Sequence, residues 1–396
     1  MYSYKEVMTY CEEEDVKFIR LAFCDLQGCQ KNIAIMPSEL ERAFQYGISF
    51  DASAIHGFGD EIKSDLFLFP DPSTLSVLPW RPSQGRVVRM FCDIRHPDGT
   101  PFRRDSRYLL KQAIAAAEQM GVSCFFGVEF EFYLFQTDEN CAPTRIPFDQ
   151  ATYMDIAPED RGENIRRDIC LTLESMGIQP ESSHHEEGPG QNEIDFRYSA
   201  PLTAADNAVT FQAVVKTIAM QNGLYACFSP KPIPGQSGNG LHINMSIQSP
   251  GGKADQDAFM AGILSHIREI TAFLNPTEES YLRLGERKAP KYITWSSENR
   301  SQLIRIPAAK GEYVRFELRS PDPTTNPYLA YALLIYAGLD GIRKQMTLCP
   351  PLDMNLFTAD KSITSTLETL PSNLEEALEL ARQSKLISDY MPELLC

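Results

Sequence analysis

In four short stretches of the chain, acidic, basic or histidine residues alternate with apolar ones. The stretches are residues 127–132, 192–197, 241–246 and 314–319. Side chains of a strand alternate between its two faces, so Glu129 and Glu131 share a face, as do Arg315, Glu317 and Arg319. If the four stretches join one sheet, that face gathers carboxylates, a histidine and arginines. Such a surface suits divalent cations and an anionic substrate.

The apolar residues of the same stretches would form the opposite face and pack on a core. They are Val128, Phe130, Phe132, Ile194, Phe196, Ile243, Met245, Phe316 and Leu318. Alternation alone is also typical of an antiparallel strand whose polar side simply faces water. Lysine, however, is absent from all four stretches, and neighbours such as Glu129 and Glu131 repel each other unless a cation lies between them. Glu and His are acceptable ligands for Mg²⁺ or Mn²⁺, so the pattern favours a metal site.

Two glycine-rich loops adjoin these stretches. Glu186 lies in a Gly- and Pro-rich turn that leads to Glu193, and residues 235–240 lead directly into His242. Glycine lets a backbone approach a ligand closely, although a tight turn is the simpler interpretation. Residues 235–240 match neither GxxxxGK[ST] nor GxGxxG, so the sequence supports neither a Walker nor a Rossmann nucleotide site.

A block of arginines follows. Arg300 and Arg305 precede the last of the four stretches. Arginine keeps its charge and can bind phosphate or carboxylate through two hydrogen bonds. Surface ion pairs are the alternative, but Ile304 and Ile306 indicate a strand that packs on a core. We therefore expect these arginines to face a ligand.

Composition limits the classes of function. The 396 residues, of which 43% are hydrophobic, are enough for a large core and two domains. The net charge of −16 argues against nucleic acid as the main partner. No stretch is long enough to span a membrane, and no signal peptide is visible. Ten cysteines without CxxC pairs indicate reduced thiols and a cytoplasmic protein.

The elements that must position these residues mix strands and helices without strict βαβ alternation, which predicts an α+β fold. Strands are expected at 16–23 and 85–92, with an irregular Pro-rich stretch at 69–82 between them. Glycine stops and the Asn326-Pro327 cap define most helices. These are expected at 106–120, 159–176, 204–221, 255–274, from 326 onward, and 374–386. The turn-rich segment 96–102 would link two domains, 1–98 and 99–396.

In their order along the chain, these motifs resemble the bacterial type of glutamine synthetase over nearly the whole length. The matching phrases are Phe50-Asp-Ala-Ser-Ala-Ile, Asp98-Gly-Thr-Pro-Phe102, Glu129-Phe-Glu131, His184-His-Glu186, Pro189-Gly-Gln-Asn-Glu193, Gly240-Leu-His242, Asn299-Arg-Ser, Ile304-Arg-Ile-Pro, Arg315-Phe-Glu-Leu-Arg-Ser and Asn326-Pro-Tyr-Leu-Ala. The resemblance implies an N-terminal β-grasp domain and a catalytic domain with a curved antiparallel sheet flanked by helices. It also implies a ligase that joins ammonia to the γ-carboxylate of glutamate through γ-glutamyl phosphate, consuming ATP.

The resemblance also assigns roles to single residues. One Mg²⁺ or Mn²⁺ would be held by Glu131, Glu186 and Glu193, and a second by Glu129, His242 and Glu317. Arg283, Arg300 and Arg319 would bind glutamate and the transferring phosphoryl group. The amino acid would touch Gly238, and ATP would contact Arg305, Arg315 and Ser246. Asp51 would help to bind and deprotonate ammonium across a subunit interface, which implies a homo-oligomeric ring with sites between subunits.

The chain departs from the family pattern at several positions. Its flap, residues 283–290, is one residue shorter than usual, and Lys288 replaces the family's glutamate before Ala-Pro. A lysine there would repel ammonium, and Glu286 is the candidate to replace that glutamate. Ala54 lacks the family's hydroxyl, and Asn244 replaces a second histidine. The chain also ends where the family continues with a helical tail, which leaves a single or a double ring open.

Two alternatives accompany the main interpretation. A γ-glutamyl ligase that uses another amine as its acceptor would explain the altered flap and Ala54, whereas the retained Asp51 speaks against it. A non-catalytic regulator on the same fold would be expected to have lost metal ligands, and none of the six is lost.

Overall fold

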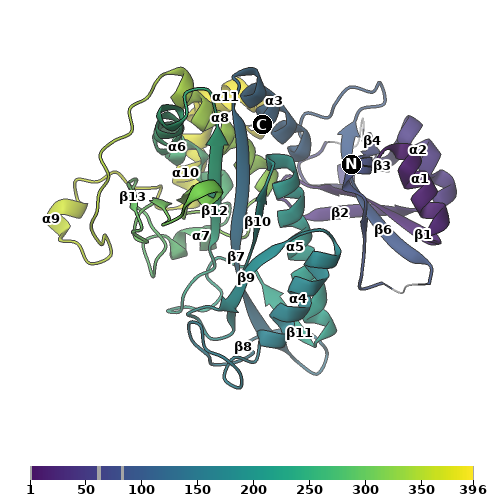
Figure 1. Cartoon of the computed structure of the whole chain (residues 1–396), viewed down its shortest axis with the longest axis horizontal. Coiled ribbons are helices and arrows are strands. Elements are labelled where there is room, and N and C mark those ends of the chain that lie inside the picture. The colour runs from purple at the N-terminus through teal and green to yellow at the C-terminus, as the bar shows by residue number, and fades with distance from the viewer. Residues whose placement is uncertain (1, 60–63, 82–83, 396) are drawn as a thin grey trace.

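The computed structural model describes residues 2–59, 64–81 and 84–395, which form two sheets (Figure 1). The first sheet has the strand order β2-β1-β6-β4-β3, and β5 pairs with β6. Its strands are β1 (Val16–Cys24), β2 (Gln30–Ile35), β3 (Ile48–Asp51), β4 (Asp65–Pro70), β5 (Ser76–Val77) and β6 (Arg86–Arg95). Strands β1 and β6 run parallel, and the other pairs are antiparallel. Helices α1 (Tyr4–Glu13) and α2 (Leu40–Tyr46) pack beside this sheet.

The second sheet has nine strands in the order β13-β14-β15-β12-β7-β10-β9, with β11 and β8 also paired to β7. Its strands are β7 (Ser123–Thr137), β8 (Pro143–Pro147), β9 (Pro180–His185), β10 (Gln191–Ser199), β11 (Leu224–Cys227), β12 (Leu241–Gln248), β13 (Trp295–Ser297), β14 (Ile304–Ile306) and β15 (Phe316–Leu318). All described pairs in it are antiparallel except β13 with β14. The predicted α+β class with an antiparallel catalytic sheet is confirmed.

Helices cover one face of the second sheet. The helices of this part of the chain are α3 (Ser106–Gln119), α4 (Glu163–Ser175), α5 (Pro201–Gln221), α6 (Lys253–Leu274), α7 (Glu278–Arg283), α8 (Pro327–Arg343), α9 (Lys361–Thr364), α10 (Leu374–Gln383) and α11 (Lys385–Tyr390). The short α9 lies away from the sheet (Figure 1). The nine apolar residues of the four alternating stretches are all buried, as predicted. For example, the ring of Phe130 stacks on that of Phe211 in α5 at 4.8 Å between centroids. The core therefore fixes which side of the sheet presents its polar side chains.

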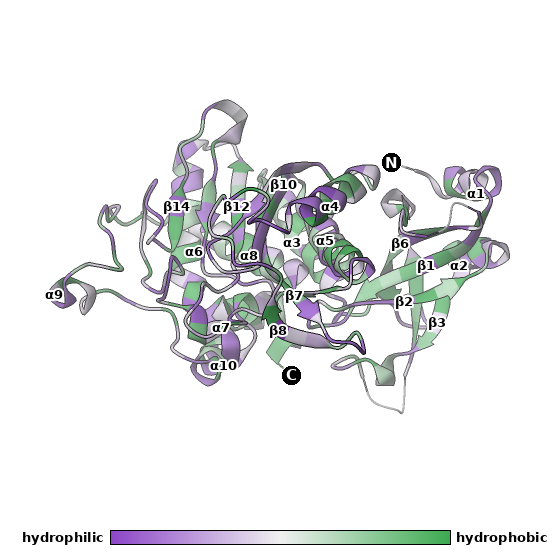
Figure 2. Cartoon of the chain, turned by 90° about the horizontal axis from the view of Figure 1, so that it is seen from below, coloured by the Kyte–Doolittle hydropathy of each residue, from purple (hydrophilic) through white to green (hydrophobic). Residues whose placement is uncertain are grey.

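The hydropathy of the residues agrees with this arrangement of buried apolar and outward polar faces. In Figure 2 the strands of the first sheet are largely green, whereas much of α4 is purple where it faces outward. Among the described residues, no helix combines the length and apolar character needed to cross a membrane. The nine described cysteines are all free thiols.

Ion pairs and hydrogen bonds connect the first sheet to the helices that pack on the second sheet. Arg107 at the start of α3 is buried and binds Asp93 of β6 at 3.0 Å, Asp71 at 2.9 Å and Asp206 of α5 at 3.0 Å. Asn326, the cap of α8, donates hydrogen bonds to two backbone carbonyls in the loop after β1. These contacts hold the first sheet against the helices of the second.

Two predicted helices differ most from the structure, one by an internal break and one by a later start. The helix expected at 374–386 is broken at Ser384, whose backbone is extended and whose hydroxyl accepts a hydrogen bond from the N–H of Ile387. Ser384 therefore ends α10 and caps α11. The helix expected from 159 begins at Glu163, because Asp160 holds the preceding turn through the N–H of Gly162 and the guanidinium of Arg166.

Candidate functional site

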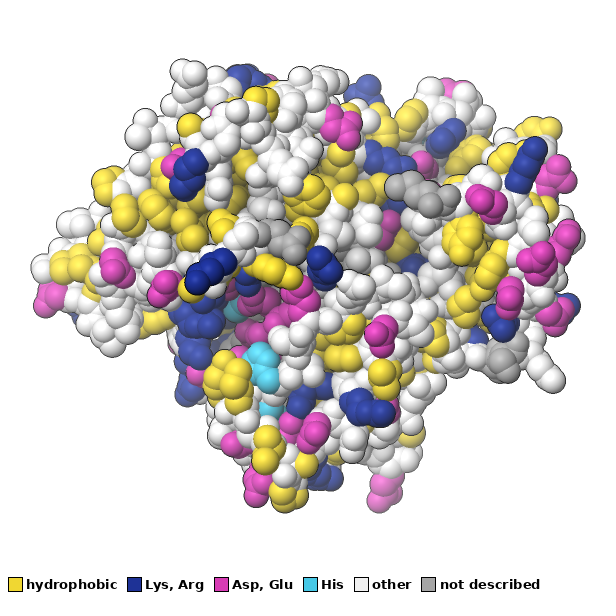
Figure 3. Space-filling model, in the orientation of Figure 1, with side chains coloured by type: hydrophobic (Ala, Val, Ile, Leu, Met, Phe, Trp, Pro, Cys, Tyr) yellow, Lys and Arg dark blue, Asp and Glu magenta, His cyan; other side chains and the backbone are white. Residues whose placement is uncertain are grey.

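Polar residues from all four stretches line a cavity of about 310 Å³ on the uncovered face of the second sheet: Glu129, Glu131, Glu193, Asp195, His242, Arg315 and Arg319. Strand register places Glu131 of β7 opposite Glu193 of β10. Glu129 lies opposite both Asp195 on one side and His242 of β12 on the other. Figure 3 shows acidic side chains and histidine in a central hollow, with dark-blue basic side chains beside it. The register alone thus concentrates negative charge at one place.

Glu129, His242 and Glu317 form the first compact group, with one ligand atom from each lying within 4.8 Å of the others. His242 Nδ1 lies 3.1 Å from a carboxylate oxygen of Glu129 and 3.5 Å from one of Glu317. Asn244 donates to the other oxygen of Glu129 at 2.9 Å. Burial opposes ionisation of Glu129, but His242 and Asn244 hold its pKa well below its usual range. This is the set that the resemblance assigns to one metal.

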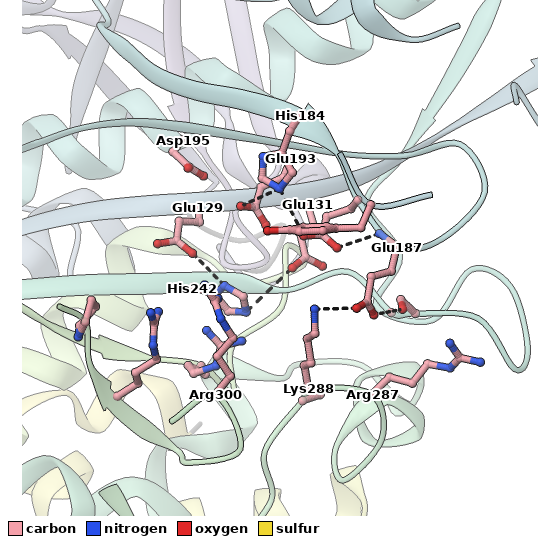
Figure 4. Close-up of a pocket in the computed structure, with 18 of the residues that line it drawn as sticks. Glu129, Glu131, His184, Glu187, Glu193, Asp195, His242, Arg287, Lys288 and Arg300 are labelled. Carbon is pink, nitrogen blue, oxygen red and sulfur yellow. Dashed lines mark hydrogen bonds and ion pairs between the residues drawn. The ribbon is translucent and has the colours of Figure 1, made fainter. Parts of the chain in front are cut away.

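The other predicted set is divided between two overlapping groups. Glu131 and Glu193 group with His242, whereas Glu186 and Glu193 group with His184. Figure 4 shows Glu193 between His184 of one group and His242 of the other. His184 was not predicted as a ligand; its ring nitrogen lies 3.3 Å from Glu186 and 3.8 Å from Glu193. The His184-His-Glu186 run was the signal that could have indicated it.

Burial and repulsion between neighbouring carboxylates disfavour the ionised form of several acidic residues in the cavity. Burial, and then the charges of the surrounding carboxylates, raise the pKa of Glu193 well above its ordinary value and that of Asp195 to about 8. Burial also raises the pKa of Glu131. Burial opposes ionisation of Glu186 too, but hydrogen bonds and the nearby Lys288 lower its pKa. Divalent cations would remove this cost, because they replace the missing positive charge. The donor set of carboxylates and imidazole therefore fits Mg²⁺ or Mn²⁺.

Arginines line the other side of the cavity. Arg305 and Arg319 both bind Glu317, the former at 2.7 Å, and the Nε atoms of both are buried without a hydrogen-bond partner among the described residues. Arg315 donates to Asn244 at 2.8 Å. Arg283 is buried and donates to the backbone carbonyls of residues 319 and 320. Unpartnered guanidinium donors beside a carboxylate cluster are suited to an anionic ligand.

The remaining predicted site residues are placed as follows. Arg300 and Gly238 line the main cavity. Ser246 instead lines an adjoining hollow with Phe125, Tyr198 and Tyr313, and both hollows share Glu129, Asp195 and Arg315. Asp51 ends β3 in the first sheet and lines neither hollow; it accepts hydrogen bonds from Ser53, which lower its pKa. Within one chain the structure therefore does not bring Asp51 to the other candidates.

The altered flap reaches the cavity with a lysine and not with an acid. Lys288 binds Glu187 at 2.6 Å, and both line the cavity. Glu286 does not line it; instead it binds Lys231 at 2.8 Å, which lowers the pKa of Glu286. Sequence reasoning missed Glu187, Tyr153 and Asp195 as members of the site. For Asp195 the signal was available, since it shares the alternation of Glu193.

Comparisons with known proteins identify the family of the chain. The family model described as the catalytic domain of glutamine synthetase matches residues 103–396, and the model described as its beta-Grasp domain matches residues 15–97. A glutamine synthetase of Methanosarcina mazei is 47% identical over 98% of this chain and 90% of its own. One from Staphylococcus aureus (strain Mu50) is 42% identical over 97% of this chain and 90% of its own.

Solved structures share the architecture. The GmaS/ADP complex superposes with a TM-score of 0.88 at 30% identity, covering 97% of this chain and 91% of that one. A glutamine synthetase of Plasmodium falciparum superposes with a TM-score of 0.87 at 22% identity, covering 100% of this chain and 94% of that one, and it supports the fold alone.

Proposed function

This chain belongs to the glutamine synthetase family, and on that premise we propose that it ligates ammonia to the γ-carboxylate of glutamate at the expense of ATP. One observation carries the proposal: a single cavity joins the carboxylate and imidazole groups suited to divalent cations with Arg305 and Arg319, whose buried Nε atoms have no hydrogen-bond partner among the described residues. A ligase that phosphorylates a carboxylate needs both features.

The chemistry explains the need. A carboxylate is a poor electrophile, so glutamate is first converted to γ-glutamyl phosphate, which ammonia then attacks. We assign Arg283, Arg300 and Arg319 to glutamate and the transferring phosphoryl group, with Gly238 beside the amino acid. Arg305, Arg315 and Ser246 would contact ATP, with Ser246 in the adjoining hollow. Guanidinium groups stabilise the charge that develops on the phosphoryl oxygens.

Two divalent ions, Mg²⁺ or Mn²⁺, are the proposed cofactors, and they would neutralise phosphate charge and align the reacting groups. Glu129, His242 and Glu317 would hold one ion. The other would be held by Glu131, Glu186 and Glu193, and the contact of His184 with the last two supports a place for it in that group.

We propose a homo-oligomeric ring whose neighbouring subunit supplies Asp51, because that residue ends a strand of the first sheet outside both hollows of its own chain. The proposed units are residues 1–98 and 99–396. Mixing inactive Asp51→Ala and Glu131→Ala chains tests this arrangement. Recovery of activity in mixed oligomers is expected, and no recovery in demonstrably mixed oligomers would contradict a shared site.

The first measurement is phosphate release from ATP with Mg²⁺, glutamate and either ammonium or a series of primary amines, with products identified by mass spectrometry. Glutamine is the expected product. A product with an amine but not with ammonium would favour the alternative γ-glutamyl ligase. No product with any acceptor would favour a regulator.

Glu131→Ala tests the metal assignment. We expect glutamate-dependent ATP turnover to fall about 100-fold or more, since a metal ligand is lost. Unchanged turnover would mean that the assignment is wrong.

A further inference from the structure

Glu187 differs from every other acidic residue that lines the main cavity. Glu129, Glu131, Glu186, Glu193 and Asp195 all belong to groups that could hold a metal ion, whereas Glu187 belongs to none of the groups found among the described residues. It lies in the turn between β9 and β10, immediately after Glu186. The candidate metal groups found among the described residues therefore do not involve this carboxylate.

That carboxylate already binds an ammonium group from the protein itself. Lys288 Nζ lies 2.6 Å from one oxygen of Glu187, and the other oxygen accepts a hydrogen bond from the Ser237 hydroxyl at 3.2 Å. The same Nζ lies 5.1 Å from the centre of the Tyr153 ring, within the range of a cation–π interaction. Figure 4 shows Lys288 and Glu187 pointing toward one another beside the metal-type carboxylates. A carboxylate and an aromatic face together form a site for a primary ammonium ion.

The site is close to the reacting groups. The Tyr153 ring meets the ring of His184 edge-on, with centroids 5.4 Å apart, and His184 contacts Glu186. Lys288 is near enough to Glu186 to help lower the pKa of that carboxyl. A cationic nitrogen at Glu187 would thus lie beside the proposed metal group.

The flap holds Lys288 in an unusual conformation. Arg287 and Lys288 have φ angles of 38° and 66°, a region that residues other than glycine rarely adopt. Both ends of the ion pair are also partly exposed, with 43% of the Lys288 side chain and 33% of the Glu187 side chain accessible. An incoming cation can therefore reach the carboxylate, and the departing lysine can relax toward solvent.

We propose that Glu187, together with the face of Tyr153, receives the cationic nitrogen acceptor, and that Lys288 occupies this place until the acceptor displaces it. The acceptor class is a small primary ammonium ion, with ammonium itself as the smallest member. The inference rests on the proposed ligase activity and names the acceptor subsite within it.

The proposal predicts opposite effects for the two partners of one ion pair. Glu187→Gln removes the acceptor's carboxylate, so the KM for ammonium should rise by about tenfold. Lys288→Met removes the competitor, so the KM for ammonium should fall. The double variant should behave like Glu187→Gln, because without the carboxylate nothing is left to compete for. If the Lys288–Glu187 ion pair only held the flap in position, both single variants would shift the KM for ammonium in the same direction.

Glu286→Gln is the matched control, since Glu286 lies in the same flap and forms a comparable ion pair with Lys231 outside the cavity. Its KM for ammonium should equal that of the wild type. The readout is the KM for ammonium relative to the KM values for ATP and glutamate, which a general folding defect does not shift selectively. The same series is repeated with methylamine and ethylamine.

The outcomes separate the two proposals. If the wild type forms no product with any acceptor, the ligase function fails. If the wild type turns over but both single variants shift the KM alike, or Glu286→Gln shifts it and Glu187→Gln does not, the acceptor subsite is wrong and the ligase function stands.

Discussion

Asp195 offers the sharpest quantitative test of the charge balance in the cavity. This residue lies in β10 directly opposite Glu129, and its buried Oδ1 has no hydrogen-bond partner in the part of the chain that the structure describes. Burial, then the charge of Glu129, raise its pKa to about 8 from an ordinary value of 3.8, although the Ser182 hydroxyl partly opposes the shift. We predict that Asp195→Asn stabilises the protein when divalent ions are absent.

The magnitude follows from proton linkage. An acid whose pKa is raised by folding destabilises the folded state above its unfolded pKa, and the penalty grows up to its folded pKa. At about 1.36 kcal/mol per pH unit, the full penalty at pH 7 is about 4 kcal/mol. Because the neighbouring carboxylates share this repulsion and the side chain is partly exposed, we expect Asp195→Asn to recover about 2 kcal/mol.

The assay is urea unfolding of wild type and Asp195→Asn in EDTA between pH 4 and pH 8. The advantage of the variant should be greatest near pH 8 and should be nearly lost near pH 4, close to the ordinary aspartate pKa of 3.8, where the unfolded carboxyl begins to bind the proton that the folded one already holds. Saturating Mg²⁺ should reduce the advantage, since a cation favours the ionised wild-type side chain. A variant that is no more stable than the wild type at pH 8, or equally more stable at every pH, would refute the reasoning.

Two further predictions concern the residues that shape the site. A Cβ on Gly240 would lie 2.8 Å from His242 Nε2 and 2.9 Å from an Arg283 nitrogen, so Gly240→Ala should reduce kcat/KM by about 100-fold through misplacement of the imidazole; wild-type kinetics and Mg²⁺ affinity would contradict this. Asp149 accepts hydrogen bonds from the buried His185 ring at 2.9 Å and from the N–H of Gly190. Asp149→Ala should therefore lower the free energy of unfolding by about 2–4 kcal/mol, with Asp149→Asn milder, as measured by urea titration.

The sequence was sufficient to predict the polar and apolar faces of the central sheet. Alternation fixes the side on which each residue of a strand lies. A shift of one residue in the assigned alternation would have placed Phe130 and Ile194 in water. It could not predict that Glu129 faces both Asp195 and His242, because strand order depends on packing of segments far apart in the sequence. Strand order and register came from the structure.

The helix boundaries show a similar limit. Ser384 and Lys385 interrupt the apolar pattern that runs from Leu374 to Ala381, but a serine by itself does not determine whether a helix ends there. The break depends on Ser384 capping the next helix and on its hydroxyl binding Glu269 of α6. Tertiary contacts of this kind override a helical pattern, since a hydroxyl that caps one helix cannot serve the interior of another.

The flap shows most clearly why a motif comparison alone misled. Lys288 at the place of the family's glutamate was expected to repel ammonium, and Glu286 was the candidate replacement because it is near in sequence. In the structure Glu286 binds Lys231 away from the cavity, whereas Glu187 supplies the acid from a different loop and binds Lys288. A positive side chain opposite a carboxylate is neutralised, so the cavity gains no net repulsion from the lysine. The charge at this place therefore has to be judged for the pair of loops, since neither loop alone determines whether a cationic acceptor can bind.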